Sequence, residues 1–315
     1  MAETANGGDP PTGGNVPEIE LIIRASTIDG RRKGACLFCH EYFMDLYLLA
    51  ELKTISLKIT TVDMLKPPPD FRSNFEATPP PILIDEGVAV LENEDIERHI
   101  MKNIPGGHNL FVRDKEVASA IENVYSKFKI MLLKKDESSK SILMSHLRKV
   151  NDHLESKGYR FLTGDTMCCF DCELMPRLQH IRVAGAFFAD FHIPGDLKAI
   201  WKYYEEMYKL DAFNQSCPAD QDIINHYKLQ QGTKMSKREE LEAPTFTNTV
   251  PEAIWKSPPQ VHIENNIAFL KTQKNSLCYL LFYSFAKLNL KLTRLSHPRQ
   301  VYRPSLAWKI NLLKI

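Results

Sequence analysis

Apolar and polar residues follow two different patterns along the chain, and the change between them indicates two domains. In the first hundred residues, short apolar or alternating runs typical of strands are interspersed with stretches that have the three- to four-residue apolar spacing of helices. The predicted strands are residues 18–24, 55–62, 82–84 and 88–91, and the predicted helices are residues 36–52, 69–75 and 92–103. Proline runs at 67–69 and 79–81 separate some of these elements. The predicted order is therefore βαβαββα.

A polar hinge at Pro105-Gly106-Gly107 precedes a region in which only helical spacing is found. Helices are predicted at residues 112–135, 138–157, 165–188, 194–210 and 219–231. We therefore expect an α/β domain at 18–103, a linker at 104–111 and an all-helical domain at 112–232. Residues 1–17 are expected to form a disordered leader, and residues 233–315 a largely disordered tail in which the regular pattern ends.

The formal net charge of +1 is unevenly distributed along the chain. Residues 253–315 hold ten lysines and arginines and one acidic residue, Glu264, so the preceding part of the chain is acidic. An acidic body argues against nucleic acid as a partner, since phosphate binding needs concentrated positive charge. Two interpretations of the basic end stay open: it binds acidic lipid, or it is an alternative or unspliced segment without a physiological role.

The leader and the cysteines together predict a cytoplasmic location. The leader lacks the basic start and apolar run of a secretory signal, and seven cysteines in such a chain fit reduced thiols better than a disulfide framework. No stretch reaches the roughly 18 consecutive apolar residues of a membrane span.

Cys36-Leu37-Phe38-Cys39 stands where a basic loop, Arg31-Arg32-Lys33, meets the start of a predicted helix. The unpaired N–H groups and the helix dipole stabilise a thiolate at Cys36, and Cys39 lies one turn away, where it can resolve a mixed disulfide. We expect the basic loop to lower the pKa of the Cys36 thiol further. The alternative is that both residues are small buried thiols that only pack.

Four motifs occur along the chain in the order found in one known family. They are Lys33-Gly34-Ala35-Cys36-Leu37-Phe38-Cys39 with Phe43-Met44, then Phe161-Leu162-Thr163-Gly164-Asp165, then residues 171–178, and finally Ser216-Cys217-Pro218. With them, residues 18–231 resemble the chloride intracellular channel family, nearest its invertebrate branch. This resemblance implies a glutathione transferase-like fold, in which an α/β thioredoxin-like domain precedes an all-α domain.

The resemblance also implies a glutathione site. Cys36 matches the family's reactive thiol, and Cys39, where vertebrate members often have serine, permits a dithiol cycle. The residues implied in glutathione binding are Arg24, Phe38, Pro80, Pro81, Glu92 and Asn93. Pro81 matches a cis-proline that exposes the backbone amide and carbonyl before it. Leu37 departs from the pattern, because glutaredoxins and many family members have proline there.

Three further cysteines, Cys168, Cys169 and Cys172, resemble a zinc motif when taken with the first pair. We expect no metal site, because the two groups lie in different predicted domains and both open helices. Asp171, within an otherwise apolar helix, is expected to accept hydrogen bonds from backbone amides near the start of that helix.

The resemblance implies a protein of the cytoplasm that associates with or inserts into membranes and conducts chloride. Its implied partners are glutathione, chloride and acidic membrane lipids, with a possible oligomer in the membrane. Spacing alone favours residues 36–52 as a core helix. At a bilayer centre, Asp45, Glu51 and Lys53 would each cost on the order of 2.5 to 3.5 kcal/mol, so low pH, oligomerisation or charge pairing is expected. The alternatives are a glutathione-dependent, glutaredoxin-like thiol oxidoreductase that uses Cys36, and a non-catalytic adaptor.

Overall fold

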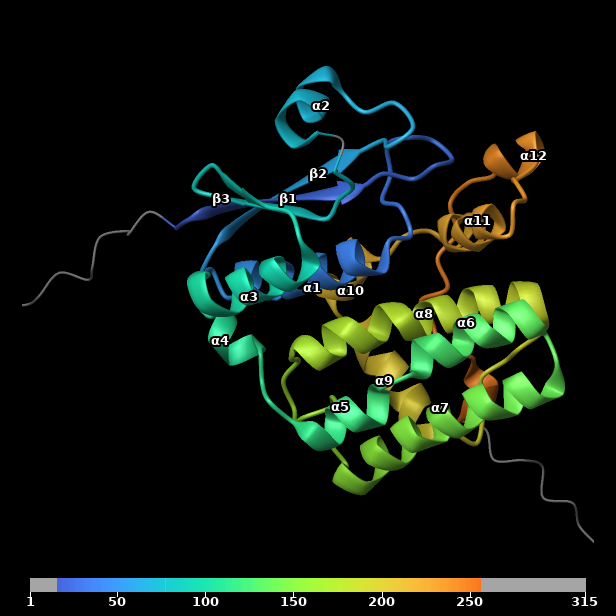
Figure 1. Cartoon of the computed structure of the whole chain (residues 1–315). Coiled ribbons are helices and arrows are strands. Elements are labelled where there is room, and N and C mark those ends of the chain that lie inside the picture. Colours follow the sequence, from blue (N-terminus) through green and yellow to red (C-terminus); the bar gives the residue numbers. More distant parts are fainter. Residues whose placement is uncertain (1–15, 77, 256–315) are drawn as a thin grey trace, which may run out of the picture. The chain divides into compact units, whose positions relative to one another are not determined.

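A four-stranded mixed sheet organises the N-terminal part of the structure, a computed structural model that describes residues 16–76 and 78–255 (Figure 1). Its strands are β1 (Glu18–Arg24), β2 (Ser56–Val62), β3 (Ile82–Asp85) and β4 (Val88–Val90), in the order β2-β1-β3-β4. β1 is parallel to β2 and antiparallel to β3, which pairs antiparallel with β4. The parallel pair needs a crossover connection, and α1 (Leu37–Glu51) provides it.

Helices cover both faces of this sheet (Figure 1). In β1, Ile19, Leu21 and Ile23 point to a core shared with α1 and α3 (Asn93–Asn103), whereas Ile22 packs in a separate cluster with Phe71 of α2 (Pro69–Phe75). This alternation follows from the two-residue period of a strand. The order βαβαββα predicted from the sequence is confirmed.

After β4, the described residues form helices and loops and no further strand. The helices after α3 are α4 (Gly107–Leu110), α5 (Lys115–Ile121), α6 (Val124–Lys134), α7 (Glu137–Lys157), α8 (Cys169–Ala189), α9 (Lys198–Tyr208), α10 (Asp211–Ser216), α11 (Asp220–Gln230), α12 (Lys237–Glu240) and a 3-10 turn at Glu252–Ile254. The fold is thus a thioredoxin-like domain followed by an all-helical domain.

The single helix predicted at 112–135 is wrong, because the chain breaks between α5 and α6. Asn123 adopts a left-handed backbone (φ 65°), which asparagine tolerates better than most residues, and Glu122 is extended in ψ. The apolar spacing continues through the break, so periodicity alone did not reveal it. The helix predicted from residue 165 likewise starts later, at Cys169, because Cys168 is extended (φ −137°, ψ 178°) and its N–H donates to Asp171 Oδ2 at 2.9 Å as the N-cap.

The expected linker at 104–111 contains α4, and glycine is required at its start. Gly106 has φ 86°, and a Cβ on Gly107 would lie 1.8 Å from Ile100 O, closer than any side chain tolerates. The hinge is therefore a tight turn packed on α3 and not a loose connection.

The tail expected from residue 233 is wrong for residues 233–255, which pack on the helical domain. Thr245 O accepts from Asp220 N at 2.9 Å, and Thr247 O accepts from Gln179 Nε2 at 2.8 Å. Arg182 Nη2 donates to Thr249 O at 2.7 Å. This segment therefore adds hydrogen-bonded backbone along α8 and α11. The expected leader (1–15) and residues 256–315 lie outside the described residues.

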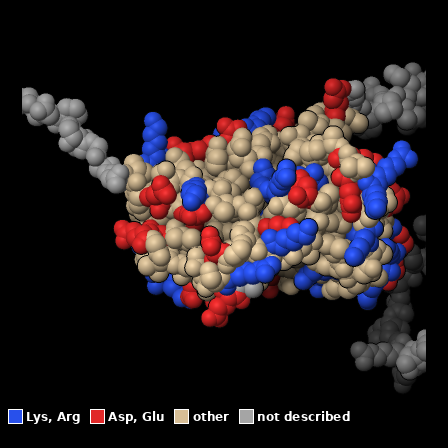
Figure 2. All heavy atoms as spheres, turned by 90° about the horizontal axis from the view of Figure 1, so that it is seen from above, with Lys and Arg blue, Asp and Glu red and all other residues tan. Residues whose placement is uncertain are grey.

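Helix α1 contributes side chains to two hydrophobic cores. Tyr42, Phe43 and Leu46 pack with the sheet and α3, whereas Met44 packs in the core of the helical domain. The described helices include none with the length and apolar character that crossing a bilayer requires. On the face drawn in Figure 2, acidic and basic side chains are interspersed, so that face has no continuous basic stripe.

Candidate functional site

Cys36 is the N-cap of α1, at the end of a loop that the strands hold in place. Gly34 N donates to Arg24 O at 2.9 Å, and a Cβ on Gly34 would lie 2.5 Å from Ala25 O, so only glycine fits this approach. The Cys36 backbone is extended (φ −86°, ψ 119°), and its carbonyl accepts from His40 N at 3.0 Å. The thiol therefore lies beside the free N–H groups of the first helical turn.

The environment of Cys36 favours a thiolate. A hydrogen bond from the Cys39 thiol, the N–H groups of Cys39 and Phe38, and the charge of Arg24 together lower the pKa of Cys36 to about 6, although burial opposes this. Burial raises the pKa of Cys39 well above its usual range, and its hydrogen bond to Cys36 adds to the effect. Cys36 is half-buried, whereas Cys39 is 2% exposed. The pair thus consists of one accessible thiolate and one protonated thiol that donates to it.

The basic loop does not supply the charge that we expected it to supply. Arg32 Nε pairs with Asp222 Oδ2 at 2.6 Å, and Lys33 Nζ donates to Gln215 O at 2.7 Å. Among the charged residues that act on Cys36, it is Arg24, at the end of β1, that lowers its pKa. The loop residues instead connect the two domains.

A cavity of about 560 Å³ opens over Cys36. Arg24 and Phe38 line it from the α/β domain, and the facing wall comes from Tyr125 of α6 and from His226 and Gln230 of α11, among others. A cavity of about 610 Å³ also lies among α8, α9, α11 and residues 245–254, but no cysteine lines it. The thiol and the cavity beside it therefore define the candidate site.

Sequence reasoning missed the wall contributed by the helical domain. Tyr125, His226 and Gln230 stand in amphipathic helices, where periodicity predicts only which face is buried. No local motif marks them, because they meet Cys36 only when the two domains pack.

The residues implied in glutathione binding divide into two groups. Arg24 and Phe38 line the cavity with Cys36, whereas Pro80, Pro81, Glu92 and Asn93 are not among its lining residues. The Pro80–Pro81 peptide bond is cis, as expected. Pro80 has no N–H to offer a ligand, and its carbonyl already accepts from Arg24 Nε at 3.0 Å.

The second group connects to the cavity through a ring contact. The Phe38 ring stacks on Tyr42 with 6.3 Å between centroids, and Tyr42 Oη donates to Asn93 O at 2.9 Å. Glu92, the exposed N-cap of α3, makes no side-chain capping bond. Glu92 and Asn93 therefore lie at the start of α3 and do not line the cavity that Cys36 lines.

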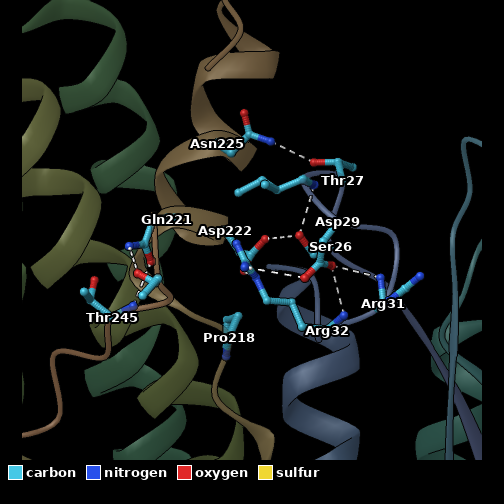
Figure 3. Close-up of polar contacts among 12 residues, drawn as sticks. Ser26, Thr27, Asp29, Arg31, Arg32, Pro218, Gln221, Asp222, Asn225 and Thr245 are labelled. Atoms are coloured by element: carbon cyan, nitrogen blue, oxygen red, sulfur yellow. Dashed lines mark hydrogen bonds and ion pairs between the residues drawn. The ribbon is translucent and has the colours of Figure 1, made fainter. Parts of the chain in front are cut away.

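A polar clasp, defined here as Ser26, Thr27, Arg32, Asp222 and Asn225, joins the β1–α1 loop to α11 (Figure 3). Asp222 accepts from Ser26 Oγ and, through its other oxygen, from Arg32 Nε at 2.6 Å. Asn225 Nδ2 donates to Thr27 Oγ1 at 2.8 Å. The side chain of Asp222 is 2% exposed, so this pair is poorly screened by solvent. The clasp holds the loop that carries Cys36 against the helical domain.

Asp171 has the role that we expected at the start of α8. Its carboxylate accepts from Cys168 N at 2.9 Å, from Leu162 N at 3.1 Å and from Tyr203 Oη at 3.0 Å. Burial raises the pKa of Asp171, and these bonds oppose that rise. Within residues 16–76 and 78–255, no three potential metal-ligating side chains of histidine, cysteine, aspartate or glutamate come together.

Two acidic residues of α1 face α8, of which Glu41 is half-buried and Asp45 is buried. Glu41 pairs with Arg177 Nη1 at 3.0 Å, and burial raises the pKa of Glu41 to about 7. Asp45 is 1% exposed, and burial raises its pKa well above the usual range. Asp45 contacts the Cys172 thiol, and its Oδ1 has no hydrogen-bond partner among the described residues. Burial thus favours the neutral form of Asp45.

Known proteins with the same features identify the family. The CLIC-like N-terminal domain family matches residues 17–105. The chloride intracellular channel Clic of Drosophila melanogaster is 77% identical over 237 residues, which cover 75% of this chain and 91% of that protein. The crystal structure of the CLIC homologue EXC-4 from Caenorhabditis elegans matches with a TM-score of 0.71 at 36% identity, covering 76% of this chain and 96% of that one.

A more distant structure shows the wider fold. The Leishmania protein TDR1, a trimeric glutathione transferase, matches with a TM-score of 0.51 at 16% identity over 68% of this chain and 48% of that one. This likeness concerns the fold alone. The identity to Clic shows the family, and the cysteine at the first helix and the two-domain architecture agree with it. The chain therefore belongs to the chloride intracellular channel family.

Proposed function

We propose that this protein associates with membranes and provides a path for chloride. The 77% identity to Drosophila Clic across 91% of that protein carries the proposal. We further propose that the protein acts from the cytoplasm on membranes that contain acidic lipid, and that more than one copy forms the path.

The position of α1 defines what membrane entry requires. The helix has 15 residues, whereas a span needs about 20, so residues beyond its ends must join it. Its departure would expose Tyr42, Leu46 and Met44, which are all at most 2% exposed. Entry therefore requires the two domains to separate, and the clasp opposes that separation.

Chloride release from vesicles tests this function. Vesicles of phosphatidylcholine with phosphatidylserine, loaded with chloride, should release it when the protein is added, and vesicles of phosphatidylcholine alone should release less. A chain that ends at Trp255, whose folding circular dichroism checks, tests the basic end, which we expect to increase lipid binding.

The clasp provides a matched pair of variants for the same assay. Asp222→Asn removes the charge that pairs with Arg32, and we expect faster release because the domains separate more easily. Asp196→Asn removes an exposed partner of Arg148 and serves as control, since such surface pairs contribute little. If vesicles with the protein release chloride no faster than protein-free vesicles under every condition, the proposed path is ruled out.

A second activity, glutathione-dependent thiol–disulfide exchange, is favoured by the lowered pKa of Cys36 beside an open cavity. We propose that the Cys36 thiolate attacks one sulfur of a disulfide and forms a mixed disulfide. The other sulfur leaves with the electron pair as a thiolate. Glutathione then attacks the mixed disulfide, which regenerates Cys36 and releases a glutathione disulfide.

The burial of Cys39 favours glutathione over Cys39 as the resolving thiol, because a thiol with a raised pKa is a poor nucleophile. Cys36→Ser should abolish glutathione-dependent reduction of a peptide–glutathione mixed disulfide. Cys39→Ser should keep turnover, because a hydroxyl can still donate to Cys36. Unchanged turnover in Cys36→Ser would reject the activity.

A further inference from the structure

A chain of hydrogen bonds runs from the cavity over Cys36 into the helical core. Tyr125 Oη lies 3.1 Å from Tyr227 Oη, and Tyr227 Oη lies 2.9 Å from His180 Nδ1. Tyr125 is half-buried and lines the cavity, whereas Tyr227 and His180 are almost fully buried. The three residues come from α6, α11 and α8, so only the tertiary structure brings them together.

The direction of these bonds follows from the surroundings of His180. Its burial lowers its pKa well below the usual range, so the ring is neutral and carries one N–H. His180 Nε2 is buried and has no hydrogen-bond partner among the described residues. An unpaired buried N–H is rarer than an unpaired acceptor, so the proton belongs on Nδ1.

The Nδ1 tautomer orients both tyrosine hydroxyls. His180 Nδ1–H donates to Tyr227 Oη, and the Tyr227 hydroxyl therefore donates to Tyr125 Oη. The Tyr125 hydroxyl hydrogen has no acceptor within this chain of bonds, and its ring lines the cavity that Cys36 lines. Each donation also polarises the next hydroxyl, which strengthens the terminal donor.

We propose that Tyr125 is a catalytic residue of the thiol–disulfide exchange, as the hydrogen-bond donor to the sulfur that leaves as a thiolate when Cys36 attacks a disulfide. The proposal rests on the exchange activity proposed above. In this step a bond forms from Cys36 to one sulfur and the disulfide bond breaks, and Tyr125 stabilises the departing negative charge without giving up its proton. Tyr227 and His180 are positioning residues, because they act through Tyr125.

The other polar groups of the cavity are less suited to this role. Arg24 donates from Nε to Pro80 O, and its charge stabilises the thiolate of the nucleophile Cys36. His226 Nε2 lies 2.8 Å from the Gln230 amide. Burial lowers the pKa of His226, so its ring is neutral near pH 7. Thr27 also lines the cavity, but its hydroxyl accepts from Asn225 Nδ2 at 2.8 Å as part of the clasp, whereas Tyr125 is oriented by the bonds from Tyr227 and His180.

Two disulfides that differ in their leaving thiolate test the assignment in the full chain. Glutathione disulfide releases a basic thiolate, whereas Ellman's reagent, an aromatic disulfide, releases a weakly basic one that gains less from a donor. Mass spectrometry of the Cys36 peptide follows one exchange event without turnover. Tyr125→Phe should slow the exchange with glutathione disulfide about tenfold, the size of one hydrogen bond to charge, and the exchange with Ellman's reagent much less.

Tyr227→Phe should slow the reaction with glutathione disulfide about threefold, because Tyr125 keeps its hydroxyl but loses its orientation. The double variant should be no slower than Tyr125→Phe alone. Equal slowing with both disulfides, or additive losses, would overturn the assignment and indicate a merely structural role. Circular dichroism confirms that each variant folds.

The tautomer of His180 gives a readout that does not depend on activity. ¹⁵N NMR distinguishes a protonated from an unprotonated ring nitrogen, and we expect the proton on Nδ1. A proton on Nε2 would reverse the chain of bonds and overturn the proposal. If turnover with glutathione is absent while the difference between the two disulfides persists, the proposed activity fails and the assignment of Tyr125 stands.

Discussion

Two helices of this protein, α1 and α8, have a cysteine at the N-cap, and the two thiols have different surroundings. Cys36 borders a cavity of about 560 Å³ and is half-buried, whereas Cys168 is 2% exposed. The Cys168 thiol contacts Thr163 Oγ1 at 3.3 Å and Asp171 Oδ2 at 3.4 Å. Both thiols lie at the positive end of a helix dipole, which stabilises a thiolate in each case.

The difference shows that a helix N-terminus alone does not make a cysteine reactive. At Cys36 the neighbouring charge is Arg24, which supports a thiolate, and the half-buried residue lines a cavity. At Cys168 a hydrogen bond with the Cys169 thiol lowers the pKa of the thiol, although burial and the charge of Asp171 oppose this. Cys168 is 2% exposed, so the protein covers the sulfur. Both thiols have a lowered pKa, so access to the sulfur decides between chemistry and capping.

The strongest test of this comparison is the alkylation of each thiol in the native protein. We expect Cys36 to react with iodoacetamide roughly a hundred times faster than Cys168, because Cys36 lines a cavity whereas the protein covers Cys168. The rate at Cys36 should rise with pH through a midpoint of about 6, as the thiolate forms. Peptide mapping by mass spectrometry measures both rates in one sample. Comparable rates would break the comparison.

Removing the acid at α8 should have the largest effect on stability. Asp171→Ala leaves Cys168 N, Leu162 N and Tyr203 Oη without their acceptor, and we expect a loss of about 3 kcal/mol or more. Urea unfolding measures it. Cys36→Ser at the matching position of α1 should change stability by less than about 1 kcal/mol. A small loss for Asp171→Ala would mean that capping is not its role.

The pH dependence of stability is expected to reflect two titratable residues of α1, His40 and Glu41. Burial lowers the pKa of His40 to about 3, so its contribution to stability is full above about pH 6.5 and is lost as the pH falls. Burial raises the pKa of Glu41 to about 7, so protonation of Glu41 stabilises the fold as the pH falls from about 7 toward 4.5.

The two effects oppose each other between about pH 6.5 and pH 4.5, so single variants should reveal them. Relative to wild type, His40→Gln should gain about 2 kcal/mol over this range on acidification, and Glu41→Gln should lose about as much. Urea unfolding at several pH values measures the difference. If the stability curves of both variants run parallel to that of wild type over this pH range, neither group has a pKa that differs between the folded and unfolded states.

The smallest effect is expected from Cys168→Thr. A hydroxyl caps a helix better than a thiol, so stability should stay constant or rise by up to about 1 kcal/mol. The same replacement at Cys36 should abolish its reactivity. A clear loss of stability in Cys168→Thr would show that the sulfur itself, and not the cap, is needed at α8.

Much of the fold followed from local pattern. Strand and helix positions in the α/β domain came from periodicity, the cis bond at Pro81 from the family resemblance, and the capping role of Asp171 from a carboxylate in an apolar helix. The break at Asn123 was missed, because apolar spacing continues on both sides of it. The packed segment 233–255 was missed for the opposite reason, since backbone hydrogen bonds hold it and they leave no periodic signal.

Local patterns in the chain specify which elements form and which thiol begins α1, because periodicity, turn residues and helix termini are local properties. The surroundings of that thiol depend on how the domains pack. Arg24 replaced the basic loop as the charge that acts on Cys36, and Arg32 of that loop pairs instead with Asp222. Tyr125 reached the cavity from α6. Such contacts join residues far apart in the chain, so they depend on how the domains pack.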